Sequence, residues 1–340
     1  MKALILEHYN ESFQLKEIEK PIASKGQVLV KIKASGVNPI DLKIKKGQAG
    51  HAKTVLPAIL GIDMSGVVEA VGEGVTHFKP GDEVYGMTGG IAGVHGTLSE
   101  YAAVDADLLA LKPKNLSMRE AAAVPLIFIT AWEGLVDRAN VSEGKSVLIH
   151  GGAGGVGHIA VQIAKAKDAR VFTTVQTDKN DLIKKYGATP IDYKNTTVEE
   201  YVDKYTSGEG FDIIYDTVGG EILDASFKAA KQYFGHVLSI LGWGTHSIAP
   251  LSFHGATYSG VFALYPLISG KARAHHGEIL REATKLIEAG KVIPLVDQVH
   301  YSLETVVDAY NAQEKRTANG KVVIDIDEVT HESESNLLFS

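Results

Sequence analysis

The chain has 340 residues, a length that suggests two domains, and its 45% hydrophobic and 22% charged residues are ordinary for a globular protein. A net charge of −7 gives no reason to expect a nucleic-acid or anionic-membrane partner. The absence of cysteine excludes disulfides, thiol nucleophiles and cysteine-ligated zinc. The N-terminus lacks a signal-peptide pattern and no apolar run reaches the roughly 18 residues that span a bilayer, so we expect a cytoplasmic protein.

Residues 1–122 are predicted to form a compact, mostly β domain. Turn residues separate alternating or β-rich segments, which we expect to be strands at Lys2–Leu6, Phe13–Ile18, Val28–Ala34, Gly66–Val71 and Leu98–Val104. Ser117 stands three residues before Glu120, which is the spacing of a capping box. This pair predicts a helix that begins at the end of the domain.

Residues 123–265 alternate between predicted strands and helices. The strands are expected at Val147–His150, Arg170–Val175, Pro190–Asp192, Ile213–Thr217, His236–Leu241 and Tyr258–Phe262. Such alternation predicts a parallel sheet with helices on both faces. Residues 266–330, with an amphipathic helix at Gly277–Ala289 and a strand at Lys321–Ile326, are expected to return to the first domain. The tail at 331–340 is expected to be disordered.

A glycine-rich turn lies between the buried strand at 147–150 and an apolar-periodic helix. Gly152, Gly154 and Gly157 satisfy the pattern G-x-G-x-x-G in this strand–turn–helix context. Glycines permit a tight turn and close backbone approach, and the free N–H groups at a helix start attract a pyrophosphate. The alternative is an ordinary glycine-rich loop. We predict that coenzyme contacts come from Gly152, Ala153, Gly154, Gly155, Val156 and Gly157.

Several further motifs occur in one order along nearly the whole chain. They are Gly36-Val-Asn38-Pro-Ile-Asp41, Leu60-Gly-Ile-Asp63-Met-Ser-Gly66, Lys79-Pro-Gly-Asp82, Gly96-Thr-Leu-Ser-Glu-Tyr101, Asp216-Thr-Val-Gly219 and Gly320-Lys321. With the glycine loop, this set resembles the zinc-independent quinone oxidoreductase and enone reductase group of medium-chain dehydrogenases/reductases. The resemblance implies an α/β protein with a GroES-like, mostly β catalytic domain and a Rossmann domain with a doubly wound parallel sheet. It also implies a homodimer joined through edge strands near Tyr258–Leu267.

The same resemblance bears on metal binding. Zinc-dependent relatives have Cys at position 38 and Gly-His-Glu at positions 61–63, where this chain has Asn38 and Gly61-Ile62-Asp63. An isoleucine side chain cannot ligate zinc, and a zinc site needs three or four convergent ligands. We therefore predict that no metal is bound.

The second strand of the parallel sheet bears on coenzyme choice. Arg170–Gln176 ends without the acidic residue that binds the ribose hydroxyls of NAD. Thr174 offers a hydroxyl and Lys179 a cation, and by resemblance Tyr193 faces the adenosine phosphate. These residues predict NADPH, although Asp178 would serve NAD if the strand were longer, and Lys179 is alternatively a solvated surface lysine.

The resemblance also implies residues at the nicotinamide end. They are Thr130, Val218, Leu241, Gly242, Val261, Phe262 and Lys321, with the last near the ribose. For the apolar members, core packing is an equally good interpretation of the sequence.

A site without a metal favours acceptors that are already activated. Hydride addition to an enone or quinone leaves negative charge on a carbonyl oxygen, and hydrogen-bond donors stabilise that charge. Asn38 is either such a donor or a structural turn amide, and Lys43 is either a cationic donor or a solvated lysine. Asp41 is expected to orient its neighbours.

The sequence therefore predicts an NADPH-dependent reductase of quinones or α,β-unsaturated carbonyls. Two other functions stay open: a zinc-free alcohol dehydrogenase, and a non-catalytic NADPH-binding protein of the crystallin type. Crystallins of this group can bind RNA, but the acidic balance argues against a nucleic-acid partner here.

Overall fold

The computed structural model describes residues 1–326 and divides the chain into two compact units. The first unit contains 1–125, 266–278 and the residues from 296 onward, and the second contains 126–265 and 279–295. Helix α10 (Arg273–Glu288) begins in the first unit and continues past residue 278 into the second. The domain boundaries expected at 122 and 265 stay a prediction. The predicted tail at 331–340 lies outside the described residues.

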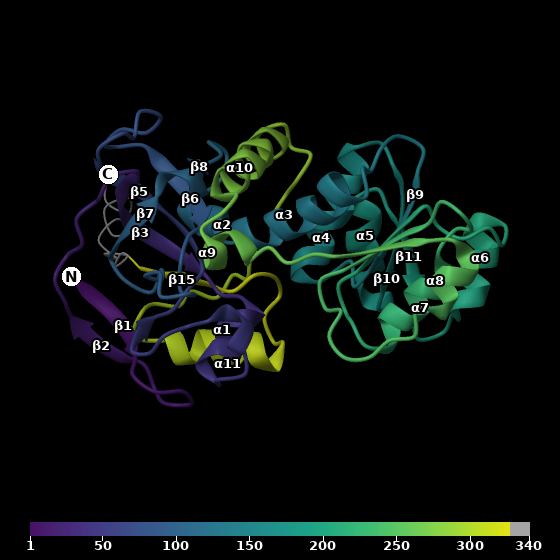
Figure 1. Ribbon diagram of the computed structural model, residues 1–340, viewed down its shortest axis with the longest axis horizontal. Coiled ribbons are helices and arrows are strands. Elements are labelled where there is room, and N and C mark those ends of the chain that lie inside the picture. Colours follow the sequence, from purple (N-terminus) through teal and green to yellow (C-terminus); the bar gives the residue numbers. More distant parts are fainter. Residues whose placement is uncertain (327–340) are drawn as a thin grey trace, which may run out of the picture. The chain divides into compact units, whose positions relative to one another are not determined.

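The first unit is built on two antiparallel sheets (Figure 1). The smaller sheet has the order β2-β1-β4, with β1 (Lys2–Leu6), β2 (Gln14–Glu17) and β4 (Ala58–Ile59). The larger has the order β15-β3-β5-β6-β8, with β7 also paired to β3. Its strands are β3 (Gln27–Gly36), β5 (Asp63–Val71), β6 (Glu83–Met87), β7 (Tyr101–Asp105), β8 (Leu109–Leu111) and β15 (Val323–Asp325).

Helices of the first unit place the later candidate residues. They are α1 (Pro39–Lys45), α2 (Met118–Ala122), α9 (Tyr265–Ser269) and α11 (Val306–Lys315), with short 3-10 turns at Gly50–Ala52 and Ala106–Leu108. Ser117 and Glu120 form the predicted capping box at the start of α2. Helix α1 packs beside α11 (Figure 1). Arg119 of α2 donates to the Val323 carbonyl at 3.1 Å and to Asp325 Oδ2 at 3.0 Å, and so fixes the returning C-terminal strand.

The second unit is a six-stranded, all-parallel sheet with the order β11-β10-β9-β12-β13-β14. Its strands are β9 (Ser146–His150), β10 (Arg170–Val175), β11 (Thr189–Asp192), β12 (Ile213–Asp216), β13 (His236–Ser239) and β14 (Thr257–Gly260). The order runs outward in both directions from β9, so β9 and β12 flank the switch point where doubly wound sheets bind ligands. The predicted fold class is confirmed.

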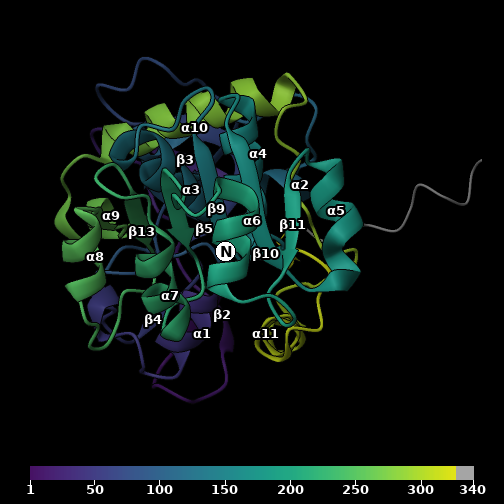
Figure 2. The ribbon, with the colours of Figure 1, turned by 90° about the vertical axis from the view of Figure 1, so that its right-hand side faces the viewer.

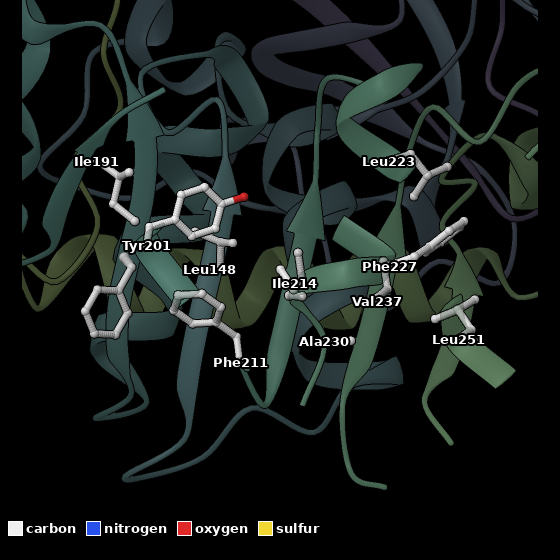
Figure 3. Packing of buried hydrophobic residues seen from close by; sticks show 12 residues of the cluster. Leu148, Ile191, Tyr201, Phe211, Ile214, Leu223, Phe227, Ala230, Val237 and Leu251 are labelled. Atoms are coloured by element: carbon white, nitrogen blue, oxygen red, sulfur yellow. The ribbon is translucent and has the colours of Figure 1, made fainter. Parts of the chain in front are cut away.

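Helices surround this sheet (Figure 2). They are α3 (Pro125–Trp132) with its π-helical continuation Glu133–Arg138, α4 (Gly155–Ala166), α5 (Asn180–Lys185), α6 (Val198–Thr206), α7 (Glu221–Ala229) and α8 (Ala249–His254). Alternate strand residues, among them Leu148, Ile214 and Val237, point to one face, where side chains of α6, α7 and α8 cover them (Figure 3). Burial of this face holds the strand ends in register.

Within residues 1–326, no helix combines the length and the apolar character that crossing a bilayer requires. The cytoplasmic location expected from the sequence stays a prediction.

Candidate active site and coenzyme loop

The glycine loop joins β9 to α4. Gly154 is the N-cap of α4 and supplies no side-chain cap, so the first N–H groups of this helix are left for another acceptor. A Cβ on Gly152 would lie 2.0 Å from Thr173 Oγ1, and one on Gly157 would lie 2.1 Å from the Gly151 carbonyl oxygen. A Cβ on Gly154 would meet only the Gly151 oxygen, at 3.2 Å. Gly152 and Gly157 thus allow close packing of the backbone, and Gly154 leaves the helix start open and uncapped. This arrangement fits a dinucleotide phosphate.

The predicted coenzyme residues of the second unit follow its strands at one edge of the sheet. Because all six strands are parallel, the segments after their carboxyl ends meet at the same edge. The glycine loop follows β9, Lys179 follows β10, and Tyr193 follows β11. After β12, β13 and β14 come Val218, Leu241 with Gly242, and Val261 with Phe262, respectively.

The hydroxyl of Thr174, at the end of β10, is hydrogen-bonded to the glycine loop. Its side chain is buried, and its Oγ1 accepts from the Gly151 N–H at 3.2 Å. The same hydroxyl lies 3.1 Å from His150 Nδ1. Burial lowers the pKa of His150 to about 4, so this imidazole is neutral at physiological pH. Thr174 therefore shapes the loop, and the structure gives it little surface for direct contact with a ligand.

The surface after β10 and β11 carries exposed polar groups. Lys179 Nζ lies 3.8 Å from Asp178 Oδ2, and the Lys179 side chain is partly exposed. Gln176 Nε2 donates to Tyr193 Oη at 3.3 Å. Lys179 is thus a weakly paired, partly exposed cation at the position from which the sequence predicts binding of a 2′-phosphate.

Asp216 organises the segments after β12 and β13, a role that sequence reasoning missed. Its Oδ1 accepts from the backbone N–H groups of Val218 at 3.0 Å and Gly219 at 2.9 Å. Its Oδ2 accepts from Ser239 Oγ, which in turn accepts from the Leu241 N–H. A fully buried aspartate at the end of an apolar strand was the available signal, since such a carboxylate needs several donors.

Thr130, expected near the nicotinamide, lies in α3. Its Oγ1 donates to the Leu126 carbonyl at 2.6 Å, and its own carbonyl accepts from Tyr215 Oη at 2.6 Å. The hydroxyl oxygen keeps acceptor capacity, but the residue is largely buried. The hydrogen bond from Tyr215 to the Thr130 carbonyl therefore links α3 to strand β12.

In the first unit, three predicted residues meet in one buried polar cluster: Asn38, Asp41 and Lys321. Asn38 Nδ2 donates to Asp63 Oδ2 at 2.9 Å, and its Oδ1 accepts from Lys321 Nζ. The ammonium also donates to the Val37 carbonyl at 2.7 Å. Asn38 has no exposed surface, and both polar atoms of its amide are hydrogen-bonded within this cluster. Lys321 is bonded to this amide, and its expected place near the ribose stays a prediction.

Asp41 completes the cluster from the first turn of α1. Its Oδ2 accepts from the Asn38 backbone N–H at 2.8 Å, while its buried Oδ1 has no hydrogen-bond partner. Burial, followed by repulsion from Asp63, raises the pKa of Asp41 to about 7. Burial lowers the pKa of Lys321, against the attraction of Asp63 and Asp41. The cluster thus contains one ammonium between two carboxyl groups.

Lys43 lies two residues further along the same helix and is exposed. It is the predicted catalytic residue that offers an accessible charged donor. At the positions of zinc ligands in relatives, Ile62 is fully buried and Asn38 pairs with an ammonium. Within residues 1–326, no three His, Cys, Asp or Glu side chains gather in a way that could hold a metal ion.

Comparison with known proteins agrees with this architecture. The family described as "Alcohol dehydrogenase GroES-like domain" matches residues 24–114, and that described as "Zinc-binding dehydrogenase" matches residues 186–324. The 2-methylene-furan-3-one reductase of Solanum lycopersicum is 39% identical over 319 residues, which cover 89% of this chain and 73% of the relative. The chain belongs to the medium-chain dehydrogenase/reductase family.

Two further members of the family are similar over most of their length. The chloroplastic NADPH-dependent alkenal/one oxidoreductase of Arabidopsis thaliana is 36% identical, with 95% of this chain and 79% of the relative covered. The crystal structure of an alcohol dehydrogenase superfamily protein from Novosphingobium aromaticivorans is 51% identical with a TM-score of 0.94, covering 96% of this chain and all of that one.

Proposed function

We propose that this medium-chain dehydrogenase/reductase is an NADPH-dependent reductase of α,β-unsaturated carbonyls or quinones. The observation that carries the proposal is the uncapped start of α4, where Gly154 leaves open space at the carboxyl edge of the parallel sheet. Relatives named as a 2-methylene-furan-3-one reductase and an NADPH-dependent alkenal/one oxidoreductase support the enone class.

The coenzyme would be held by the chain's second unit. The N–H groups at the start of α4 would bind the pyrophosphate, and Lys179 would pair with the 2′-phosphate. The segments that Asp216 fixes, at Val218 and Leu241, would form the wall beside the nicotinamide. When bound, NADPH supplies the hydride.

Lys43 is our proposed donor to the carbonyl oxygen of the acceptor. An exposed ammonium can bind a developing oxyanion and is a stronger partner than a neutral amide. Asn38 and Asp41 would act indirectly, because they form the N-cap and first turn of the helix that carries Lys43. Their buried hydrogen bonds would hold α1 at a fixed orientation.

Steady-state kinetics with NADPH tests both parts of the proposal. The wild type should oxidise NADPH with short alkenals, cyclic enones or 1,4-quinones, and an enzyme that reduces none of them would contradict the proposed function. Lys43→Met should lower kcat about 100- to 1,000-fold with NADPH affinity unchanged, since one oxyanion donor is removed. Lys45→Met, on the same helix, is the matched control and should keep its activity.

We also propose a homodimer formed through strand β14. This strand pairs only with β13 among the described strands, and its residues are mostly exposed. Phe253 precedes this strand and Phe234 follows Tyr233, whose N–H donates to the His254 carbonyl. These two phenylalanines are 85% and 80% exposed, so association would cover a large apolar surface. Sedimentation should give twice the 36.4 kDa chain mass. Phe253→Asp should shift it toward one chain, whereas Ile22→Asp, also exposed but in the first unit, should not.

A further inference from the structure

His158, in the second turn after the start of α4, makes two hydrogen bonds that the proposed chemistry does not use. Its side chain is buried, and its Nδ1 lies 2.9 Å from the Gly154 carbonyl oxygen. Its Nε2 accepts from the backbone N–H of Leu295 at 3.2 Å. A carbonyl oxygen can only accept and a backbone N–H can only donate, so the imidazole is neutral with its hydrogen on Nδ1.

The Gly154 carbonyl belongs to the peptide whose N–H opens α4. In a trans peptide, the C=O of Gly154 and the N–H of Gly155 point in opposite directions. The carbonyl points along the helix, where it accepts from both the backbone N–H and the Nδ1–H of His158. Gly155 is exposed, and its N–H points outward from the helix start. Whatever fixes this carbonyl therefore fixes the direction of an N–H group that would face a phosphate bound at the start of α4.

The other nitrogen of His158 holds an extended segment at 293–295, where the chain leaves the second unit. Gln162, one helical turn further along α4, holds the same segment. Its Nε2 donates to the Ile293 carbonyl at 3.1 Å, and its Oε1 accepts from the Ile293 N–H at 2.9 Å. Of these two side chains, only His158 contacts the glycine loop.

We propose that His158 is a positioning residue for the coenzyme: it orients the Gly154–Gly155 peptide toward a dinucleotide phosphate and ties the loop to the segment at 293–295. This assignment rests on the NADPH binding proposed above. A second donor on the carbonyl also polarises the peptide, which strengthens the N–H as a donor to an anion. A purely structural role would instead make His158 and Gln162 equivalent.

Isosteric variants separate the two contacts. In His158→Asn, Nδ2 takes the place of Nδ1 and keeps the bond to Gly154 while the bond to Leu295 is lost. In His158→Gln, Oε1 takes the place of Nε2 and keeps the bond to Leu295 while the bond to Gly154 is lost. Gln162→Leu loosens the extended segment without touching the loop and is the control.

Equilibrium NADPH binding, followed by nicotinamide fluorescence, is the readout, with thermal unfolding of the coenzyme-free protein beside it. We expect His158→Gln to raise the NADPH Kd about 5- to 10-fold, the size of one lost hydrogen bond, and the other two variants to stay within about twofold of wild type. Equal Kd values for wild type and His158→Gln would overturn the proposal, as would a Gln162→Leu protein weakened to the same extent. If His158→Gln does not fold, a fivefold loss in His158→Asn would overturn it. A wild type that binds no NADPH would contradict the proposed function itself.

Discussion

The protonation of Asp41 should make stability depend on pH in a direction unusual for an aspartate. Its folded pKa of about 7 lies above its ordinary value of 3.8, so the folded state holds a proton that the unfolded chain releases. The stabilisation is fully present below the unfolded pKa and is lost as the pH rises through about 7. Asp41→Asn removes the titration and keeps an oxygen for the Asn38 N–H.

The magnitude follows from the shift. One pKa unit corresponds to about 1.4 kcal/mol, so a shift of roughly three units gives about 4 kcal/mol over the full range. Between pH 5 and pH 8, where the wild type can be handled, about 2–3 kcal/mol of this should be lost. The unpartnered nitrogen that Asn places at the Oδ1 position has a cost of its own, but that cost does not vary with pH.

Urea unfolding of the wild type and of Asp41→Asn at several pH values measures this difference. The free energy of unfolding of the variant, relative to wild type, should rise by about 2–3 kcal/mol from pH 5 to pH 8. Asp181→Asn is the control, because its side chain is fully exposed and the substitution removes a carboxyl group that lies outside the buried cluster. A wild-type-to-variant difference that stays constant over this range would show that Asp41 titrates normally, and would refute the reasoning.

Two further predictions concern the coenzyme site. Gly152→Ala should destabilise the protein and abolish NADPH binding, because its Cβ would lie 2.0 Å from Thr173 Oγ1. Gly154→Ala, whose Cβ would lie 3.2 Å from its nearest neighbour, should fold normally. Circular dichroism and thermal unfolding measure both outcomes. Lys179→Met should raise the NADPH Kd about 10-fold or more and leave the NADH Kd unchanged, since only the 2′-phosphate needs the cation. Equal losses for both coenzymes would contradict this role of Lys179.

Local signals in the sequence were sufficient to place most of the second unit. Strand β10 has the predicted bounds Arg170–Val175, and β9 differs by one residue, because buried parallel strands appear as short apolar runs between turn residues. Helix α6 lies between two predicted strands, where a helix was expected, and Thr197 and Glu200 form the capping box at its start. Strands β6 and β8 were missed, since short antiparallel strands depend on partners distant in the chain.

The candidate site was less predictable where a residue's role depends on a distant partner. The glycine spacing needs only local geometry, so the loop was found from sequence. The contact between Asn38 and Lys321 joins residues 283 positions apart, and no local pattern indicates it. The sequence also did not indicate that Thr174 bonds His150, because the direction of a hydroxyl at a strand end depends on register, which only the fold supplies.

The buried polar cluster around Asn38 and Lys321 gives a physical reason why the chain differs from the zinc-ligand pattern. Two carboxyl groups, Asp41 and Asp63, are buried side by side, and their charge would cost several kcal/mol without a compensating cation. Lys321 supplies that cation from within the chain, and a proton on Asp41 supplies the rest. The Lys321 ammonium, which is bonded to Asn38, would repel a divalent ion at this position. The buried lysine and the residues Asn38 and Ile62, which stand at zinc-ligand positions, therefore act in the same direction against metal binding.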